Sequence, residues 1–266
     1  MRNFEETPAH TIQSVVKAAK VMEALADAGK PLSLSQIAEA VSMGLPTAYR
    51  FLRTLAFLEW VERDPELKLY RIAPRVVRFA HSFFDMSDLW SFAHQHLILA
   101  RREYNETFNL AILDGTDILY LDRVKTKKIL DINLEIGSKL PAFCTSMGRV
   151  LLASQPRAKA RRLLERSART AFTRHTITDT TGLMTILDAV RTQGYAVNHG
   201  EMAPELLSVA APVSNHDGQV VAAVNMAVNA DHYDQPAVET TLIPAVISVA
   251  AGISKALGYH QQPQGG

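Results

Sequence analysis

The sequence has 266 residues, of which 47% are hydrophobic and 21% charged. This balance supports a folded core and excludes a chain that is disordered throughout. The net charge is +1, so any contact with nucleic acid must depend on where basic residues lie rather than on their number. The single cysteine, Cys144, excludes a disulfide within the chain and favours a cytoplasmic location.

We expect neither a signal peptide nor a membrane span. The first ten residues are polar and acidic, without the apolar core of a signal peptide. Ser248 and Gly252 interrupt the longest apolar stretch, so we expect no run that approaches the roughly 18 residues of a membrane span.

Three helices are predicted at the start. Residues 11–28 place apolar side chains at three- and four-residue steps, which is typical of an amphipathic helix. A second helix begins at Ser33, which has Gln36 at the spacing of a capping box. A third covers residues 45–58, with Pro46 in its first turn, where a missing N–H costs nothing.

Two short β-type runs follow, at residues 60–63 and 69–72, around the turn Asp64-Pro65-Glu66. Three helices followed by a hairpin are the order of a winged helix-turn-helix. In this fold the third helix enters the major groove and contacts base edges through its exposed side chains.

The third helix presents two arginines and hydroxyl groups on the arc opposite its apolar stripe. An amphipathic helix of this kind is by itself more often a solvated surface, and winged helices also serve as protein-interaction modules. The complete order of elements favours DNA. The predicted DNA-binding residues are Ser35, Gln36, Thr47, Tyr49, Arg50, Arg53 and Lys68.

The rest of the chain predicts an α+β domain with an antiparallel sheet. Linker and domain helices are expected at 74–85 and 88–104. The expected strands are 109–113, 118–121, 129–134, 209–213 and 220–228, the last two around the turn Asn215-His-Asp-Gly218. The expected helices are 146–154, 157–166, 181–193 and 236–257. We expect domains at 1–73 and 88–260, a linker helix at 74–87 and a tail at 261–266.

Several stretches in the same order resemble the IclR family of bacterial transcription regulators. They are Thr47-Ala-Tyr-Arg-Phe-Leu-Arg-Thr-Leu55, Asn109-Leu-Ala-Ile-Leu-Asp-Gly115, Gly137-Ser-Lys-Leu-Pro141, Gly148-Arg-Val-Leu-Leu-Ala153 and Ser208-Val-Ala-Ala-Pro-Val213. The resemblance extends from about residue 11 to residue 258. The chain departs from it at Gly44-Leu45-Pro46, where the family usually has a hydroxyl- and lysine-bearing run, and at Glu205, where glycine is common.

The resemblance implies a GAF-like sensor domain whose sheet holds a small carboxylate effector. The residues that stand at the family's effector-binding positions, as the resemblance implies, are Ile129, Ile132, Ser146, Met147, Asn198, Ser208, Asn225 and Ala227. Ser146 lies at a predicted helix start, where free N–H groups favour an anion. Arg149 and Arg123 are candidate charge partners for the carboxylate. Neutral Asn198 and Ser208 replace an acid and a thiol common in the family, which favours a hydroxylated sugar acid over a bare keto acid.

The resulting hypothesis is a homodimer, or a dimer of dimers, that represses a catabolic operon from an inverted-repeat operator. The stretches Leu257-Gly-Tyr-His260 and Tyr49-Arg-Phe-Leu52 are most similar to the family branch that controls pectin and sugar-acid breakdown. Activation in response to an aromatic acid is an alternative. A sugar-acid enzyme with a fused helix-turn-helix is an alternative from another class.

Motifs for catalysis or metal binding are weak. The sequence contains no Gly-x-Ser-x-Gly elbow and no Gly-rich phosphate loop, and a buried structural role suits Cys144 better than catalysis. His94 and His96 are two residues apart on a predicted helix and therefore point to different faces. The pairs His199 with Glu201 and His216 with Asp217 are expected at the surface. We expect no cofactor, no metal and no membrane partner.

Overall fold

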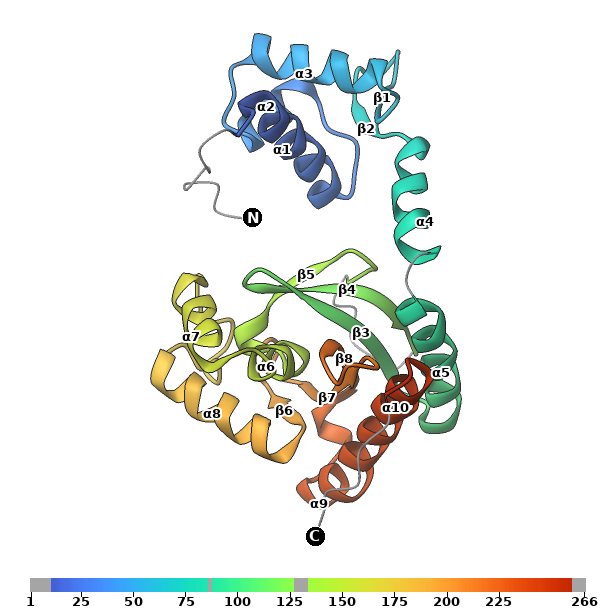
Figure 1. The fold of residues 1–266 in the computed structure, drawn as a ribbon. Helices are drawn as coiled ribbons and strands as arrows, with labels where there is room; N and C mark the ends of the chain where they lie inside the picture. Colours follow the sequence, from blue (N-terminus) through green and yellow to red (C-terminus); the bar gives the residue numbers. More distant parts are fainter. Residues whose placement is uncertain (1–10, 86–87, 127–133, 260–266) are drawn as a thin grey trace. The chain divides into compact units, whose positions relative to one another are not determined.

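The computed structural model describes residues 11–85, 88–126 and 134–259 of the chain (Figure 1). Contacts divide the chain into two compact units, Met1–Met86 and Ser87–Gly266. The expected strand at 129–134 lies, except for Leu134, outside the described residues, as does the expected tail at 261–266.

The first unit contains the predicted three helices and hairpin. The elements are α1 (Gln13–Ala28), α2 (Leu34–Ala40), α3 (Leu45–Phe57), β1 (Val61–Arg63) and β2 (Tyr70–Ile72). Ser33 caps α2, and both hydrogen bonds of the predicted capping box with Gln36 are present. The core of this unit is formed by Val21, Leu25, Ile37, Leu52, Leu55 and Tyr70. The winged helix-turn-helix prediction is therefore confirmed.

The hairpin turn is held by one aspartate. The Asp64 carboxylate accepts hydrogen bonds from the backbone N–H groups of Glu66 and Leu67, at 2.9 and 2.8 Å. Lys68 then adopts a positive φ of 57°, which returns the chain to β2. The 3-10 helix η1 (Pro74–Val76) and α4 (Val77–Asp85) follow β2.

The second unit is built on a six-stranded antiparallel sheet with the order β5-β4-β3-β8-β7-β6. Its strands are β3 (Thr107–Asp114), β4 (Asp117–Val124), β5 (Lys139–Pro141), β6 (Ala196–His199), β7 (Leu206–Ser214) and β8 (Val220–Asn229). The sequence did not predict the edge strands β5 and β6, because three or four residues are too few to show a period of two.

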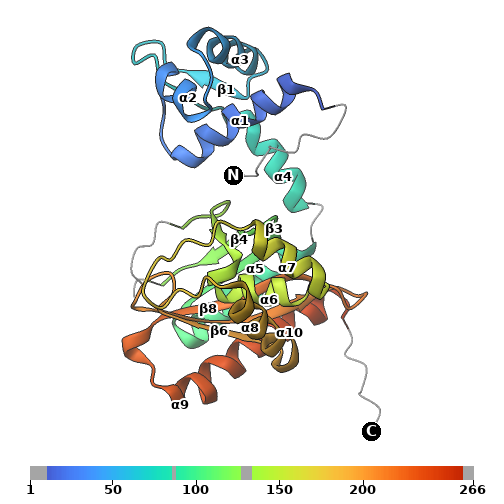
Figure 2. The ribbon, with the colours of Figure 1, turned by 90° about the vertical axis from the view of Figure 1, so that its left-hand side faces the viewer.

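Helices cover both faces of this sheet (Figures 1 and 2). One face packs on α5 (Asp88–Tyr104) and α10 (Ile243–Ala256), which also contact each other. The other packs on α6 (Ser146–Ala153), which is backed by α7 (Arg157–Arg166) and α8 (Thr180–Gln193). The two faces carry separate hydrophobic cores, so side chains that alternate along each strand enter different cores.

The closing helix, which was expected to be continuous over residues 236–257, is interrupted. A short α9 (Gln235–Ala237) is followed by a π-helical turn at Val238–Leu242 and then by α10. The Ile243 N–H bonds to the Val238 carbonyl, five residues back, which is the bond of a π-helical turn. Pro244, in the first turn of α10, has no N–H to donate to the preceding turn. Contrary to expectation, Gln235–Ala256 is long and apolar enough to cross a membrane. Half of its most apolar window is buried, as in a core helix.

Candidate functional site

The solvent-facing side of α3 is polar and basic. Thr47, Tyr49, Arg50 and Arg53 are all exposed, whereas Ala48, Leu52 and Leu55 are buried. The helix contains two arginines and no acidic residue. Gly44 caps it without a side-chain hydrogen bond. This face can donate hydrogen bonds to phosphates and base edges, because none of its side chains is needed for the core.

A groove beside α3 adds a residue that the sequence did not single out. Ser14 and Lys17 of α1 line it together with Thr47, Arg50, Phe51 and Thr54 of α3. Lys17 is exposed and stands across the groove from Arg50, so two cations border one concave surface. Only the packing of α1 against α3 brings Lys17 to this groove.

The remaining predicted DNA-binding residues lie on two other elements. Ser35 and Gln36 are exposed on α2, and Lys68 is exposed at the hairpin turn. The Gln36 side-chain oxygen accepts from the Ser33 N–H at 2.9 Å, so only its amide nitrogen is available to a partner.

The second unit contains a cavity of about 140 Å³ on the α6 side of the sheet. A cavity of about 150 Å³ holds benzene, so this one suits a ligand of about six carbon atoms. Its described lining residues are Asn109, Tyr120, Arg123, Leu134, Leu140, Cys144, Thr145, Ser146, Asn198, Met202, Ala203, Leu206, Ser208, Asn225 and Ala227. Arg123 is the single charged side chain in this set.

Strand register assembles the polar floor of the cavity. Asn109 of β3 lies opposite Arg123 of β4 on one side and Asn225 of β8 on the other. Ser208 of β7 lies opposite both Ala227 and Asn198. These residues come from five strands, and each faces the cavity because cross-strand partners share a face.

A β-bulge turns Arg123 into the cavity. Leu110 pairs with Asp122 and Ala111 with Tyr120, so Leu121 is an extra residue on β4. Strict alternation would put Asp122 beside Tyr120 and would direct Arg123 to the opposite face. The bulge reverses this phase, because it inserts one residue between them.

The N-terminus of α6 forms one wall. Thr145 caps the helix by accepting from the Gly148 N–H, and the Ser146 hydroxyl lies 2.9 Å from that of Ser208. Gly148 packs directly on Ala142, where an added Cβ would come within 2.2 Å of the carbonyl oxygen. Glycine therefore permits the close approach that brings Ser146 to the cavity.

A buried ion pair lies behind this wall. Arg149 and Glu201 are 3% and 4% exposed, and Arg149 Nη2 lies 2.6 Å from Glu201 Oε1. Glu201 also accepts from the Ile177 N–H and from Asn198 Nδ2. Arg149 is thus committed to Glu201, not to an effector as expected, and Glu201 is a buried residue, not a surface one.

Other predicted effector residues are placed differently. Met147 is buried in the hydrophobic core on the α6 side of the sheet and is not among the residues that line the cavity. Ile129 and Ile132 lie outside the described residues. Tyr120 and Cys144 line the cavity, although neither was predicted to bind an effector. Burial raises the pKa of each to about 12, the Glu201 charge adding to the effect at Cys144.

Several histidines that the structure describes have partners within the chain. His94 Nδ1 lies 2.7 Å from the buried Asp122 carboxylate, and His96 bonds to the Phe92 carbonyl on the same helix. Over the described parts of the chain, no three His, Cys, Asp or Glu residues cluster as a metal would require. His216 and Asp217 pair at the surface, as expected.

A winged helix-turn-helix joined to a domain with a cavity that is lined by apolar and polar side chains is the architecture of a transcription regulator with a ligand-binding domain. Family models agree: that of the IclR helix-turn-helix domain matches residues 14–65, and that of the bacterial transcriptional regulator IclR C-terminal domain matches residues 81–255. The chain therefore belongs to the IclR family of transcription regulators.

Known relatives are similar over most of their length. The HTH-type transcriptional regulator KdgR of Escherichia coli is 27% identical over 95% of each chain. The p-hydroxybenzoate hydroxylase transcriptional activator of Acinetobacter baylyi is 29% identical over 80% of each. The crystal structure of a transcriptional regulator from Rhodococcus sp. RHA1 has a TM-score of 0.78 and 33% identity, covering 93% of this chain and 98% of that one.

Membership of this family has three consequences. The protein is a DNA-binding regulator, and the alternative of an enzyme with a fused helix-turn-helix is wrong. The helix-turn-helix binds DNA, so its role is not confined to protein interaction. Regulators of this family also bind small-molecule effectors, and the cavity is the candidate place for one here.

Proposed function

We propose that this protein is a cytoplasmic repressor of a catabolic operon, released from its operator by a hydroxylated carboxylate such as a sugar acid. The observation that carries the effector class is the cavity lining. One cation, Arg123, suits a single carboxylate, and the neutral side chains of Asn109, Asn198, Ser208 and Asn225 suit hydroxyl groups.

The DNA contacts are assigned to the exposed face of α3. Arg50 and Arg53 reach guanine edges or phosphates in the major groove, with Thr47 and Tyr49 fixing the helix on the backbone. Lys17, which lines the protein groove between α1 and α3, contacts a phosphate. Ser35, the Gln36 amide and Lys68 contact the backbone at the edges of this surface.

The operator is proposed to be an inverted repeat bound by a homodimer or a dimer of dimers, which would place two copies of α3 in successive major grooves. The effector would change the balance between DNA-competent and DNA-incompetent arrangements through the linker helix of residues 74–87. Such control requires only that the effector bind the two arrangements with different affinity.

An aromatic acid that activates transcription is the second candidate. Tyr120, Leu134, Leu140 and Met202 provide an apolar portion of the cavity, whose volume of about 140 Å³ suits one ring. The relative from Acinetobacter baylyi is named an activator of p-hydroxybenzoate hydroxylase. Thermal-shift screening of sugar acids against hydroxybenzoates separates the two candidates, because a ligand at 100 times its dissociation constant adds about 2.7 kcal/mol of stability.

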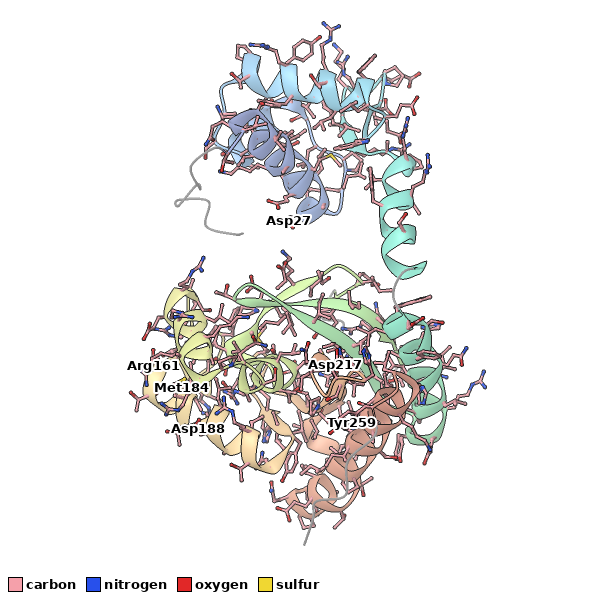
Figure 3. The ribbon with its side chains drawn as sticks, viewed as in Figure 1. Asp27, Arg161, Met184, Asp188, Asp217 and Tyr259 are labelled. Carbon is pink, nitrogen blue, oxygen red and sulfur yellow. The ribbon has the colours of Figure 1, made fainter. Side chains whose placement is uncertain are left out.

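DNA binding is tested by fluorescence anisotropy with DNA from upstream of the protein's own gene. Arg50→Ala is expected to weaken specific binding by about 1–3 kcal/mol. Arg161→Ala, which removes an exposed arginine on α7 (Figure 3), is the control and should bind as the wild type does. Equal affinity of the wild type and Arg50→Ala would contradict the assignment of α3 as the recognition helix.

A further inference from the structure

The orientation of one buried amide is fixed by its surroundings. Asn198 is 3% exposed and lines the cavity. Its Nδ2 lies 3.0 Å from the Cys144 carbonyl oxygen and 3.1 Å from Glu201 Oε1. A carbonyl and a carboxylate only accept hydrogen bonds, so the amide nitrogen must face both of them. The reverse orientation would bring three acceptor oxygens together.

Asn198 consequently offers the cavity an acceptor and no donor. Both of its N–H groups are directed to the wall, and its Oδ1 accepts no hydrogen bond from the described residues. The Arg149–Glu201 ion pair maintains this state, because Arg149 Nη2 and the Ile177 N–H hold the Glu201 carboxylate against Asn198.

A second acceptor lies on the cavity floor. Asn109 is 2% exposed and donates through Nδ2 to Asn225 Oδ1 at 2.7 Å. Its own Oδ1 is buried and has no partner among the described atoms. A buried acceptor without a donor typically costs about 1–3 kcal/mol, so a ligand that donates to Asn109 Oδ1 removes this cost. A ligand that donates to Asn198 Oδ1 uses the acceptor that this amide turns to the cavity.

We infer that Glu201 and Arg149 are specificity-determining positioning residues: they fix the Asn198 amide so that the cavity selects effectors whose hydroxyl groups donate hydrogen bonds to Asn198 Oδ1, beside the second acceptor, Asn109 Oδ1. This inference rests on the proposed effector site and deepens it. A keto oxygen or a bare alkyl chain supplies no donor at these positions, so it leaves the acceptors unsatisfied. A hydroxyl group satisfies them.

The test compares the affinities of probes with and without hydroxyl groups, measured by isothermal titration calorimetry on the full chain. The probes are D-gluconate, D-galacturonate and hexanoate. The wild type is expected to bind at least one of the two sugar acids about tenfold or more tightly than hexanoate. In Glu201→Gln, the side-chain amide replaces one of the two acceptors beside Asn198 Nδ2 by a donor, so only the Cys144 carbonyl still favours the original orientation and the Asn198 amide is no longer fixed. The preference should then fall about tenfold while the affinity for hexanoate stays the same.

Two further variants make the result decisive. Asn198→Ala removes the acceptor Oδ1, so the preference for a sugar acid over hexanoate should fall as far as it does in Glu201→Gln. Asp188→Asn removes a carboxylate that pairs with Arg157 and Arg191 at the surface of α8 (Figure 3), and should match the wild type. A purely structural role for Glu201 would weaken all probes equally.

The possible failures are distinct. If the wild type binds a sugar acid but Glu201→Gln and Asn198→Ala keep its preference, the inference is overturned and the proposed effector site stands. If the wild type prefers hexanoate, the hydroxyl selection is overturned. If none of the three probes binds, both the sugar-acid proposal and this inference fall.

Discussion

Asn109 and Arg123 lie directly opposite each other on β3 and β4, and both face the cavity. This pairing exists because Leu121 is an extra residue in β4. The neighbouring Asp122 consequently faces α5, where its carboxylate lies 2.7 Å from His94 Nδ1. Because of this extra residue, the neighbours Asp122 and Arg123 point to different faces of the sheet: the cation faces the cavity and the anion faces α5.

Arg123→Met should weaken binding of a carboxylate effector by about 10- to 150-fold, since a hydrogen bond to a charged group contributes about 1.5–3 kcal/mol. Calorimetric titration with the effector found by screening measures this loss, and affinity for DNA in the absence of effector should not change. Lys125→Met, two residues further on, is the control, because Lys125 is exposed and pairs with Glu135 outside the cavity. An unchanged dissociation constant in Arg123→Met would rule Arg123 out as the carboxylate partner.

Lys17→Ala should weaken binding to all DNA sequences to a similar degree. A lysine that contacts a phosphate releases about one counterion, so the slope of log K against log salt should become less steep by about 0.9. Anisotropy titrations between 50 and 200 mM salt, roughly the range over which such slopes are resolved, give this value. Lys30→Ala alters an exposed lysine beyond the other end of α1 and should retain the wild-type slope. A wild-type slope in Lys17→Ala would exclude Lys17 as a phosphate contact.

Gly148→Ala should destabilise the second unit by about 3 kcal/mol, the upper end of the usual cost of overpacking. The new Cβ would lie 2.2–2.6 Å from the backbone of Ala142, which cannot move without displacing the wall of the cavity. Thermal unfolding followed by circular dichroism measures the loss. Gly44→Ala is the comparison without a clash, because its Cβ would meet its nearest neighbour, Pro46 Cδ, at an ordinary 3.9 Å. Alanine is a poorer N-cap than glycine, so this variant should lose about 1 kcal/mol rather than 3. Equal melting temperatures of the two variants would contradict the close packing of α6.

Stability should fall as the pH rises from about 9 to 12. Burial raises the pKa of the Cys144 thiol from its ordinary 9.0 to about 12, and Glu201 adds to this. Between these values the unfolded chain loses the thiol proton while the folded chain retains it, so ionisation favours unfolding. Below pH 9 the contribution is fully present. Tyr120 acts in the same direction, since burial raises its pKa from 10.0 to about 12.

Cys144→Ala isolates the part of this alkaline loss that belongs to the thiol. Melting temperatures of the wild type and the variant, measured between pH 8 and 11, should converge as the pH rises. A constant difference across this range would show that the pKa of the thiol is the same in the folded and unfolded states.

Most of the first unit could be predicted from local sequence. The capping box of Ser33 and Gln36, the turn at Asp64 and the apolar stripe of α3 each depend on residues within a few positions of one another. Packing alone supplied Lys17, because its relation to Arg50 depends on how α1 lies against α3. The π turn before Pro244 also escaped prediction, since apolar periodicity is the same on both sides of it.

The cavity was predictable only in part. Positions carried over from the family resemblance found Ser146, Asn198, Ser208, Asn225 and Ala227, all of which line it. Met147, from the same set, does not line it, and neither does Arg149, which was named separately as a charge partner. Both lie on α6, where adjacent side chains diverge by about 100° around the helix axis, so a neighbour of a lining residue need not line the cavity.

By itself the sequence determined the order of the elements, the polar face of α3 and the class of protein. These depend on short-range periodicity, capping and turn chemistry, which act between residues close in the chain. The tertiary structure decided the phase of β4 at Leu121, the contact of Asn109 with Asn225 and the amide orientation of Asn198. Those features join residues up to 116 positions apart. They are set by strand register and by the rule that a buried polar group must find a partner, neither of which acts within a single segment.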